Sequence, residues 1–191
     1  MSTEIQETEV ILPDVRVGYP HLFVAVPYKK GDDKNRFSIT SYLPKSDEET
    51  KARIDTIVRD LVKENMEGVM PKKKDLPFSD GDGEDEAPEA QGNWVLRAYR
   101  PEFDSQDRPN PPQVMRLNTA VTNSQNNPVY AGCRCNVMLR FYYHTHWKRI
   151  CLQVEIVQFK RDDEAFGAVR PSINAMPEIA DEEEEGGGFD V

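Results

Sequence analysis

Alternating side-chain character marks residues 129–143 as an extended strand. From Cys133 onward every second residue is apolar or a cysteine, and the residues between them are basic, polar or aromatic. Successive side chains of a strand point to opposite faces, so this segment offers one face to a core and one to the exterior. The exterior set includes Arg134, Arg140 and Tyr142.

A second strand follows across the short turn H-T-H-W-K-R. It covers residues 150–159, and the alternation places four apolar side chains on its inner face: Ile150, Leu152, Val154 and Ile156. Two such strands joined by a short turn predict a hairpin of an antiparallel sheet with one buried face and one free face.

Further strands are predicted earlier in the chain. Residues 10–26 form a broken extended region, and Pro13, Pro20 and Pro27 confine it to an edge or bulged strand. Residues 36–43 place Arg36 and Tyr42 on the face opposite their apolar set, and residues 93–100 do the same with Arg97 and Tyr99. Trp94 falls on the apolar side of its strand, where a core position is the simpler interpretation. Residues 113–117 form one further short strand.

One helix is predicted between these strands. Ser46 and Glu49 have the spacing of a capping box, and Gly68 is a suitable stop. Its apolar stripe consists of Ile54, Ile57, Val58, Leu61 and Val62. The chain therefore combines five or six strands with one helix inserted after the second or third. This composition is typical of a small Greek-key barrel or a partly open sheet in a mainly β protein.

Charge is distributed unevenly along the chain. The net charge is −10, but residues 178–191 contain seven acids and residues 78–91 contain six, with no base in either segment. Without these 13 acids, 24 basic residues stand against 21 acidic ones, which leaves a net charge of +3. The expected barrel is therefore basic, and the excess acid lies in a loop and a tail.

The exterior faces of the predicted strands share one chemistry, which is positive charge beside flat rings. Guanidinium groups bind phosphates and tyrosine rings stack on bases, so this face predicts a nucleic-acid platform. An ordinary solvated sheet face is the alternative. The platform residues are Arg36, Tyr42, Arg97, Tyr99, Arg134, Arg140 and Tyr142, and Trp147 and Lys148 in the hairpin turn are expected to add loop contacts.

Metal and catalytic sites find less support in the sequence. Asp80, Asp82 and Glu84 resemble the start of a calcium loop, but glycine at position six and glutamate at position twelve are missing. The possible zinc ligands are Cys133, Cys135, Cys151, His144 and His146, although the cysteines are more simply interpreted as small core residues. No phosphate-binding glycine loop and no G-x-S-x-G motif occur. We therefore expect no cofactor and no enzyme activity.

The cellular setting is indicated by three features of the sequence. No apolar run approaches the ~18 residues that a membrane span requires. The acidic N-terminus has neither the basic nor the apolar region of a signal peptide. The three cysteines do not form a secreted disulfide framework, so a reducing cytoplasm is expected.

Five stretches of the chain, in order, resemble a family of tailed-phage single-stranded-DNA-binding proteins. They are V-G-Y-P-H-L-F at 17–23, F-S-I-T through L-P-K-S-D at 37–47, F-S-D-G-D at 78–82, the strand at 94–99, and V-Y-A-G-C at 129–133. The resemblance implies an oligonucleotide/oligosaccharide-binding (OB) fold that carries single-stranded DNA. It covers about residues 10–168. The predicted division of the chain is a disordered polar segment at 1–9, an OB domain at 10–170 and a flexible acidic tail at 171–191.

The tail is similar to the partner-docking tails of replication single-strand binders. Its proposed docking residues are Asp181, Glu182, Glu183, Glu184, Glu185 and Phe189, although Phe189 does not stand at the terminus. The expected function is sequence-independent coating of single-stranded DNA in phage replication or recombination, in the host cytoplasm, with possible self-association. Two alternatives remain: a phage structural or interaction protein that does not bind DNA, and a metal-dependent nuclease that uses the acids at 80–89.

Overall fold

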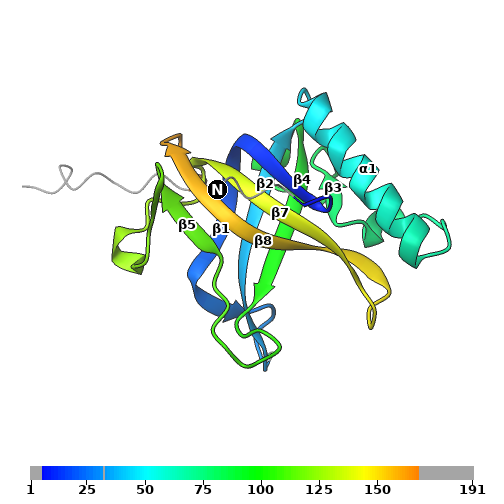
Figure 1. The fold of residues 1–191 in the computed structure, drawn as a ribbon. Helices are drawn as coiled ribbons and strands as arrows, with labels where there is room; N and C mark the ends of the chain where they lie inside the picture. The colour runs from blue at the N-terminus through cyan, green and yellow to red at the C-terminus, as the bar shows by residue number, and fades with distance from the viewer. Residues whose placement is uncertain (1–5, 32, 168–191) are drawn as a thin grey trace, which may run out of the picture.

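The computed structural model describes residues 6–31 and 33–167. This part of the chain is mainly β, with one α-helix packed against one end of the strands (Figure 1). In chain order the elements are β1 (Glu9–Pro27), β2 (Asn35–Pro44), α1 (Glu48–Asn65), η1 (Lys73–Asp75), β3 (Phe78–Asp80), η2 (Pro88–Ala90), β4 (Asn93–Pro101), β5 (Gln113–Arg116), β6 (Thr119–Ala120), η3 (Ser124–Asn126), β7 (Arg134–His144) and β8 (Arg149–Arg161), where η marks short 3₁₀ helices.

Five of the strands close into a barrel in the order β1-β2-β4-β8-β7, and β7 pairs back with β1. This is the OB arrangement, so the predicted fold class of a mainly β, five-stranded barrel with one inserted helix is confirmed. The barrel strands pair antiparallel except at closure, where Tyr99 of β4 and Gln153 of β8 form a parallel bridge. Beyond this bridge β8 leaves β4 and pairs with β5, also in parallel.

The strand β7 shows the alternation that the sequence predicts. Its inward side chains Cys135, Val137, Leu139 and Phe141 are all buried. The partner strand β8 departs from simple alternation, because Met138 pairs with Ile156 while Leu139 pairs with Val154. The extra residue, Glu155, forms a β-bulge that reverses the facing of the residues after it in β8. The expected inward position of Ile156 is therefore wrong, and Val157 is the buried residue.

The helix α1 buries the predicted stripe against the core, which confirms all five positions. Its N-cap is Asp47 and not Ser46, since the Asp47 carboxylate accepts a hydrogen bond from the backbone N–H of Thr50 at 3.0 Å. The helix ends where the N–H groups of Met66 and Gly68 both donate to the carbonyl of Val62. The positive φ of Gly68, 76°, allows this ending.

Two segments expected to be irregular contain regular structure. The strand β1 begins at Glu9, which lies inside the N-terminal segment that was expected to be disordered. The expected acidic loop at 78–91 contains the strand β3 and the 3₁₀ helix η2, and β3 extends the sheet by pairing with β4. The expected domain boundary at residue 170 and the tail at 171–191 lie outside the described residues.

Candidate nucleic-acid interface

The strand register places the predicted exterior residues on one continuous outer surface of the barrel. Tyr99 pairs with Ser38 on one side and with Gln153 on the other, and Gln153 pairs with Arg140. Paired residues of neighbouring strands point to the same face. Ser38, Tyr99, Gln153 and Arg140 therefore lie side by side on one outer surface that runs across β2, β4, β8 and β7.

An aromatic clamp around one arginine lies at the end of this surface near the β1–β2 connection. The guanidinium carbon of Arg36 lies 3.7 Å from the ring centroid of Tyr99 and 3.7 Å from that of Tyr28. Tyr28 is 59% exposed, and Lys29 places its ammonium 5.6 Å from the same ring. No acidic side chain of the described residues contacts this guanidinium. The surface here therefore carries one cation between two aromatic rings.

A second group of rings lies on the β7–β8 hairpin, which projects from the barrel (Figure 1). Trp147 is 54% exposed and stacks on His144, with ring centroids 4.0 Å apart and an interplanar angle of 15°. The guanidinium of Arg149 lies 4.9 Å from the Trp147 centroid. Lys148 is exposed beside them, at a φ of 47° that the tight turn imposes. These residues form a basic, aromatic hairpin tip.

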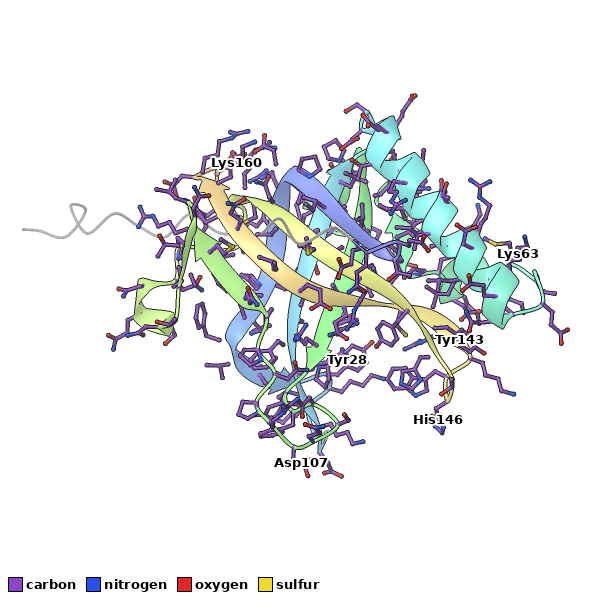
Figure 2. The ribbon with its side chains drawn as sticks, in the orientation of Figure 1. Tyr28, Lys63, Asp107, Tyr143, His146 and Lys160 are labelled. Carbon is purple, nitrogen blue, oxygen red and sulfur yellow. The ribbon has the colours of Figure 1, made fainter. Side chains whose placement is uncertain are left out.

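The clamp and the hairpin tip lie at the same end of the barrel, where Figure 2 labels Tyr28 and His146. We name the surface between them the open site and define it by Tyr28, Arg36, Tyr99, Tyr142, His144, Trp147, Lys148 and Arg149. In OB folds the face of strands 2 and 3, flanked by the loops between strands 1–2 and 4–5, is the usual oligonucleotide surface. In barrel order those elements are β2, β4, the β1–β2 connection and the β7–β8 turn.

Tyr142 connects the two halves of the open site but is only partly available. It lies on the outer face of β7 opposite Cys151 of β8, and its side chain is half-buried. Burial raises the pKa of Tyr142 above its usual value, and the neighbouring Cys151 raises that pKa further. A base can therefore contact the exposed part of this ring, while the rest supports the hairpin.

Two of the predicted phosphate-binding arginines are held by acidic neighbours. Arg97 donates to Glu86, with Nη2 and Oε2 2.5 Å apart, and to the hydroxyl of Ser79. Burial raises the pKa of Glu86, but the hydrogen bonds from Ser79 and Arg97 outweigh it and leave that pKa below its usual value. Arg140 pairs with the bulged Glu155, with Nε and Oε1 2.9 Å apart. Glu155 also binds Arg100 of β4, so one carboxylate serves two guanidiniums.

Arg134 is engaged as well. Its Nε lies 2.6 Å from Oδ2 of Asp163, and its Nη1 donates to the backbone carbonyl of Asp14. Asp163 follows β8, so this ion pair joins residues that lie 29 positions apart in the chain. Arg134 is therefore not available to a phosphate in this conformation, contrary to the expectation of a free side chain.

The expected exposure of Tyr42 is wrong. The side chain does point outward from β2, but it is only 3% exposed, because Ala90 and Phe166 cover it from outside. Burial, assisted by the charge of Glu89, raises the pKa of Tyr42 to about 12. Alternation predicts the direction of a side chain, and it cannot predict a second layer added by distant loops.

The structure supports neither the calcium site nor the zinc site that the sequence analysis considered. Asp80 and Asp82 both contact the ammonium of Lys45. Cys133 and Cys135 are buried with their sulfurs 3.7 Å apart, while Cys151 is on the outer face. Among residues 6–31 and 33–167, no group of three or more His, Cys, Asp or Glu side chains could hold a metal ion.

A family model described as "Enterobacter phage Enc34, ssDNA-binding protein" matches residues 8–186. The chain belongs to this family. The match spans every strand of the barrel and includes all five stretches on which the sequence resemblance rests. The resemblance to phage single-stranded-DNA-binding proteins is therefore confirmed. No match was found among curated proteins.

Solved structures of phage proteins share the Enc34-family fold. The single-stranded DNA-binding protein of bacteriophage Enc34, in complex with ssDNA, superposes with a TM-score of 0.71 at 24% identity, covering 85% of this chain and 91% of that one. A second structure of the same Enc34 protein gives 0.69 at 24% identity, with 89% and 90% covered. The single-stranded DNA-binding protein gp2.5 of bacteriophage T7 gives 0.53 at 12% identity, with 86% and 98% covered. At these identities the likeness establishes the fold.

Sequence reasoning missed three members of the open site in this Enc34-family chain. Tyr28 lies in a turn after Pro27, where no alternation marks it. His144 was considered only as a possible zinc ligand, and Arg149 only as part of the hairpin turn. The signal that could have found them is the pairing of an aromatic with a basic residue at both loops of the same barrel end. The tail residues Asp181, Glu182, Glu183, Glu184, Glu185 and Phe189 lie outside the described residues. Within the described part, no helix is long and apolar enough to span a membrane.

Proposed function

We propose that this protein binds single-stranded DNA without sequence specificity along the open site. The observation that carries the proposal is the clamp of Arg36 between Tyr28 and Tyr99 on the outer face of an OB barrel. The relatives named above are described as binding single-stranded DNA. A guanidinium between two rings offers positive charge for a phosphate beside flat surfaces for bases.

The chemistry of the open site favours single strands of any sequence. Every base has a π-face, so stacking on Tyr99 or Trp147 tolerates all four bases, and unstacked bases are available only in single strands. Lys148, Arg149 and the lysines of the β1–β2 connection add charge without reading base edges. We infer a coating and protecting role during phage DNA replication or recombination, in the cytoplasm of the infected cell. The family is one of DNA-binding proteins and not of enzymes.

The second part of the proposal concerns the acidic C-terminal residues. Residues 178–191 contain seven acids and no base, with a Gly186–Gly188 spacer before Phe189. A flexible segment on the same chain can reach an effective concentration in the millimolar range near a basic surface. We infer that the tail competes with DNA for the basic face and, when DNA displaces it, docks replication or recombination proteins through Phe189 and the acids at 181–185.

A titration tests the DNA proposal. Labelled oligo-dT of several lengths is added to the full chain at about 50 and about 200 mM salt, with anisotropy as the readout and magnesium in parallel samples. A binder gives salt-sensitive, length-dependent affinity and an intact strand. No binding at the lower salt would overturn the proposal and favour a structural or interaction protein. Cleavage of the strand with magnesium would favour the nuclease.

The tail needs two variants because it has two proposed roles. Deletion of residues 178–191 is expected to raise DNA affinity, most strongly at low salt where screening is weakest. Phe189→Ala keeps every charge, so DNA affinity is expected to stay near wild type while capture of phage replication proteins is lost. Unchanged affinity after the deletion would contradict competition, and retained capture by Phe189→Ala would contradict the docking role.

A further inference from the structure

The chain does not leave the barrel where β8 ends. Residues 162–166, which we name the exit segment, run back across the outer face of β1. The backbone N–H of Phe166 donates to the carbonyl of Ala131 at 3.0 Å. The hydroxyl of Tyr130 lies within hydrogen-bond distance of Asp162, of the Asp163 carbonyl and of the Asp163 N–H. A short acidic peptide is thus bound in an ordered conformation.

The exit segment presents a carboxylate to two arginines. Oδ2 of Asp163 lies 2.6 Å from Nε of Arg134 and 3.8 Å from Nε of Arg16. Arg16 also donates through Nη2 to the backbone carbonyl of Glu164. A hydrogen bond from the Glu164 N–H, together with the one from Arg134, lowers the pKa of Asp163, so the carboxylate is anionic at neutral pH. Two guanidiniums converging on one oxygen are a geometry that a phosphate also satisfies.

Three residues beyond this carboxylate, an aromatic ring fills an aromatic and cationic pocket. The ring of Phe166 packs edge-on against Tyr42 with centroids 5.4 Å apart. The guanidinium of Arg16 covers the same ring at 4.2 Å. A ring between a tyrosine and an arginine is the environment that a nucleobase occupies on a stacking platform.

Two glycines make room for this arrangement, and both lie in stretches that carry the resemblance to the family. A Cβ on Gly18 would lie 3.0 Å from Oη of Tyr42, so the glycine lets the tyrosine ring cross β1. A Cβ on Gly132 would lie 2.3 Å from the carbonyl oxygen of Glu164, and Gly132 has a φ of 107°. The exit segment therefore packs directly against the Tyr130-Ala131-Gly132 turn.

We propose that Arg16, Arg134 and Tyr42 form a second binding site for single-stranded DNA, and that the exit segment occupies it as a nucleotide mimic. The Asp163 carboxylate takes the place of a phosphate and the Phe166 ring takes the place of a base. Tyr42, Arg16 and Arg134 form one outward row across β2, β1 and β7. The outer faces of β2 and β7 lead from this row to Arg36 and Tyr142 of the open site. The inference rests on the proposed function, since it lengthens the path of the same strand.

The covered site would be filled only by DNA long enough to leave the open site. A phosphate bound by Arg16 and Arg134 displaces Asp163, and the exit segment then separates from Ala131 and Tyr42. Short oligonucleotides bind the open site alone, and longer ones also release the exit segment. Long oligonucleotides therefore contact both sites, whereas short ones contact only the open site.

Amide exchange of the unmodified full chain tests this proposal directly. The exchange rate of the Phe166 N–H is measured by NMR in the free protein, with a short oligo-dT and with a long one, and anisotropy of the labelled oligonucleotide reports binding under the same conditions. The expected result is faster exchange of Phe166 with the long oligonucleotide only. Unchanged or slower exchange while anisotropy reports binding would overturn the inference. A failure of both oligonucleotides to bind would instead overturn the proposed function.

A matched pair of variants gives a second measurement. The double variant Asp163→Asn with Phe166→Ala removes the carboxylate and the ring, while Asp60→Asn removes one charge from the exposed side of α1. The double variant is expected to bind long oligo-dT several-fold more tightly than Asp60→Asn. Its salt slope should be steeper by about 0.7, which corresponds to one added phosphate contact on a single strand. Equal affinity and equal salt slope in the two variants would show that residues 162–166 stay in place when DNA binds, which would overturn the inference.

Discussion

Replacement of Tyr99 by alanine separates stacking from charge in the open site. Tyr99 lies on the outer face of β4, and the neighbouring inward residues Leu96 and Ala98 remain buried without it. The variant loses one stacking surface and one of the two rings that hold Arg36, while Tyr28 keeps the other. The change therefore removes a DNA contact and leaves the barrel core complete.

These contacts set the expected loss of DNA affinity in Tyr99→Ala. One stacked base contributes about 1–3 kcal/mol, which corresponds to roughly a 5- to 150-fold rise in Kd. The ring touches no phosphate in this scheme, so the dependence of log Kd on log salt should keep its wild-type slope. Arg36→Ala should instead lower the magnitude of the slope by about 0.7 for one lost phosphate contact on a single strand.

Anisotropy of labelled oligo-dT at four salt concentrations measures both quantities, and a thermal melt checks the fold. Leu117→Ala is the matched control, because Leu117 is 76% exposed on the β5–β6 turn, away from the clamp and the hairpin tip. Wild-type affinity for Tyr99→Ala would refute the stacking role. A salt slope reduced as much as in Arg36→Ala would show that Tyr99 acts only by placing the arginine.

Three further outcomes are expected. Trp147→Ala should weaken binding by about 1–3 kcal/mol in the anisotropy assay with an unchanged melting temperature, since the side chain is largely exposed; a lower melting temperature would contradict this. Tyr142→Ala should lower both affinity and melting temperature, because the ring is half-buried; a loss of affinity alone would mean that its buried part supports nothing. Tyr42 has a folded pKa of about 12 against an ordinary value of 10.0, so its contribution to stability is complete below pH 10 and is lost as pH rises toward 12. Urea unfolding at about pH 9 and about pH 11 should show a larger loss for wild type than for Tyr42→Phe, and equal losses would refute the assignment.

Local periodicity was enough to predict much of the architecture. The inward residues of β7 and the buried stripe of α1 follow from periods of 2 and 3.6, which depend only on neighbouring positions. The chemistry of the outer face followed in the same way, since arginine and tyrosine alternate with the core residues in the predicted strands. The family resemblance added the closed barrel, which no strand pattern specifies by itself.

Tertiary structure decided which of those outer residues are open. Arg97, Arg140 and Arg134 meet Glu86, Glu155 and Asp163 respectively, and two of these acids come from segments outside the barrel strands. One bulge at Glu155 reverses the facing of Ile156, and Phe166 buries a tyrosine that alternation directs toward solvent. The clamp around Arg36 depends on a ring from the β1–β2 turn. A repeating pattern fixes the direction in which each side chain leaves its own backbone, whereas ion pairs, bulges and covering layers depend on segments that only the folded chain brings together.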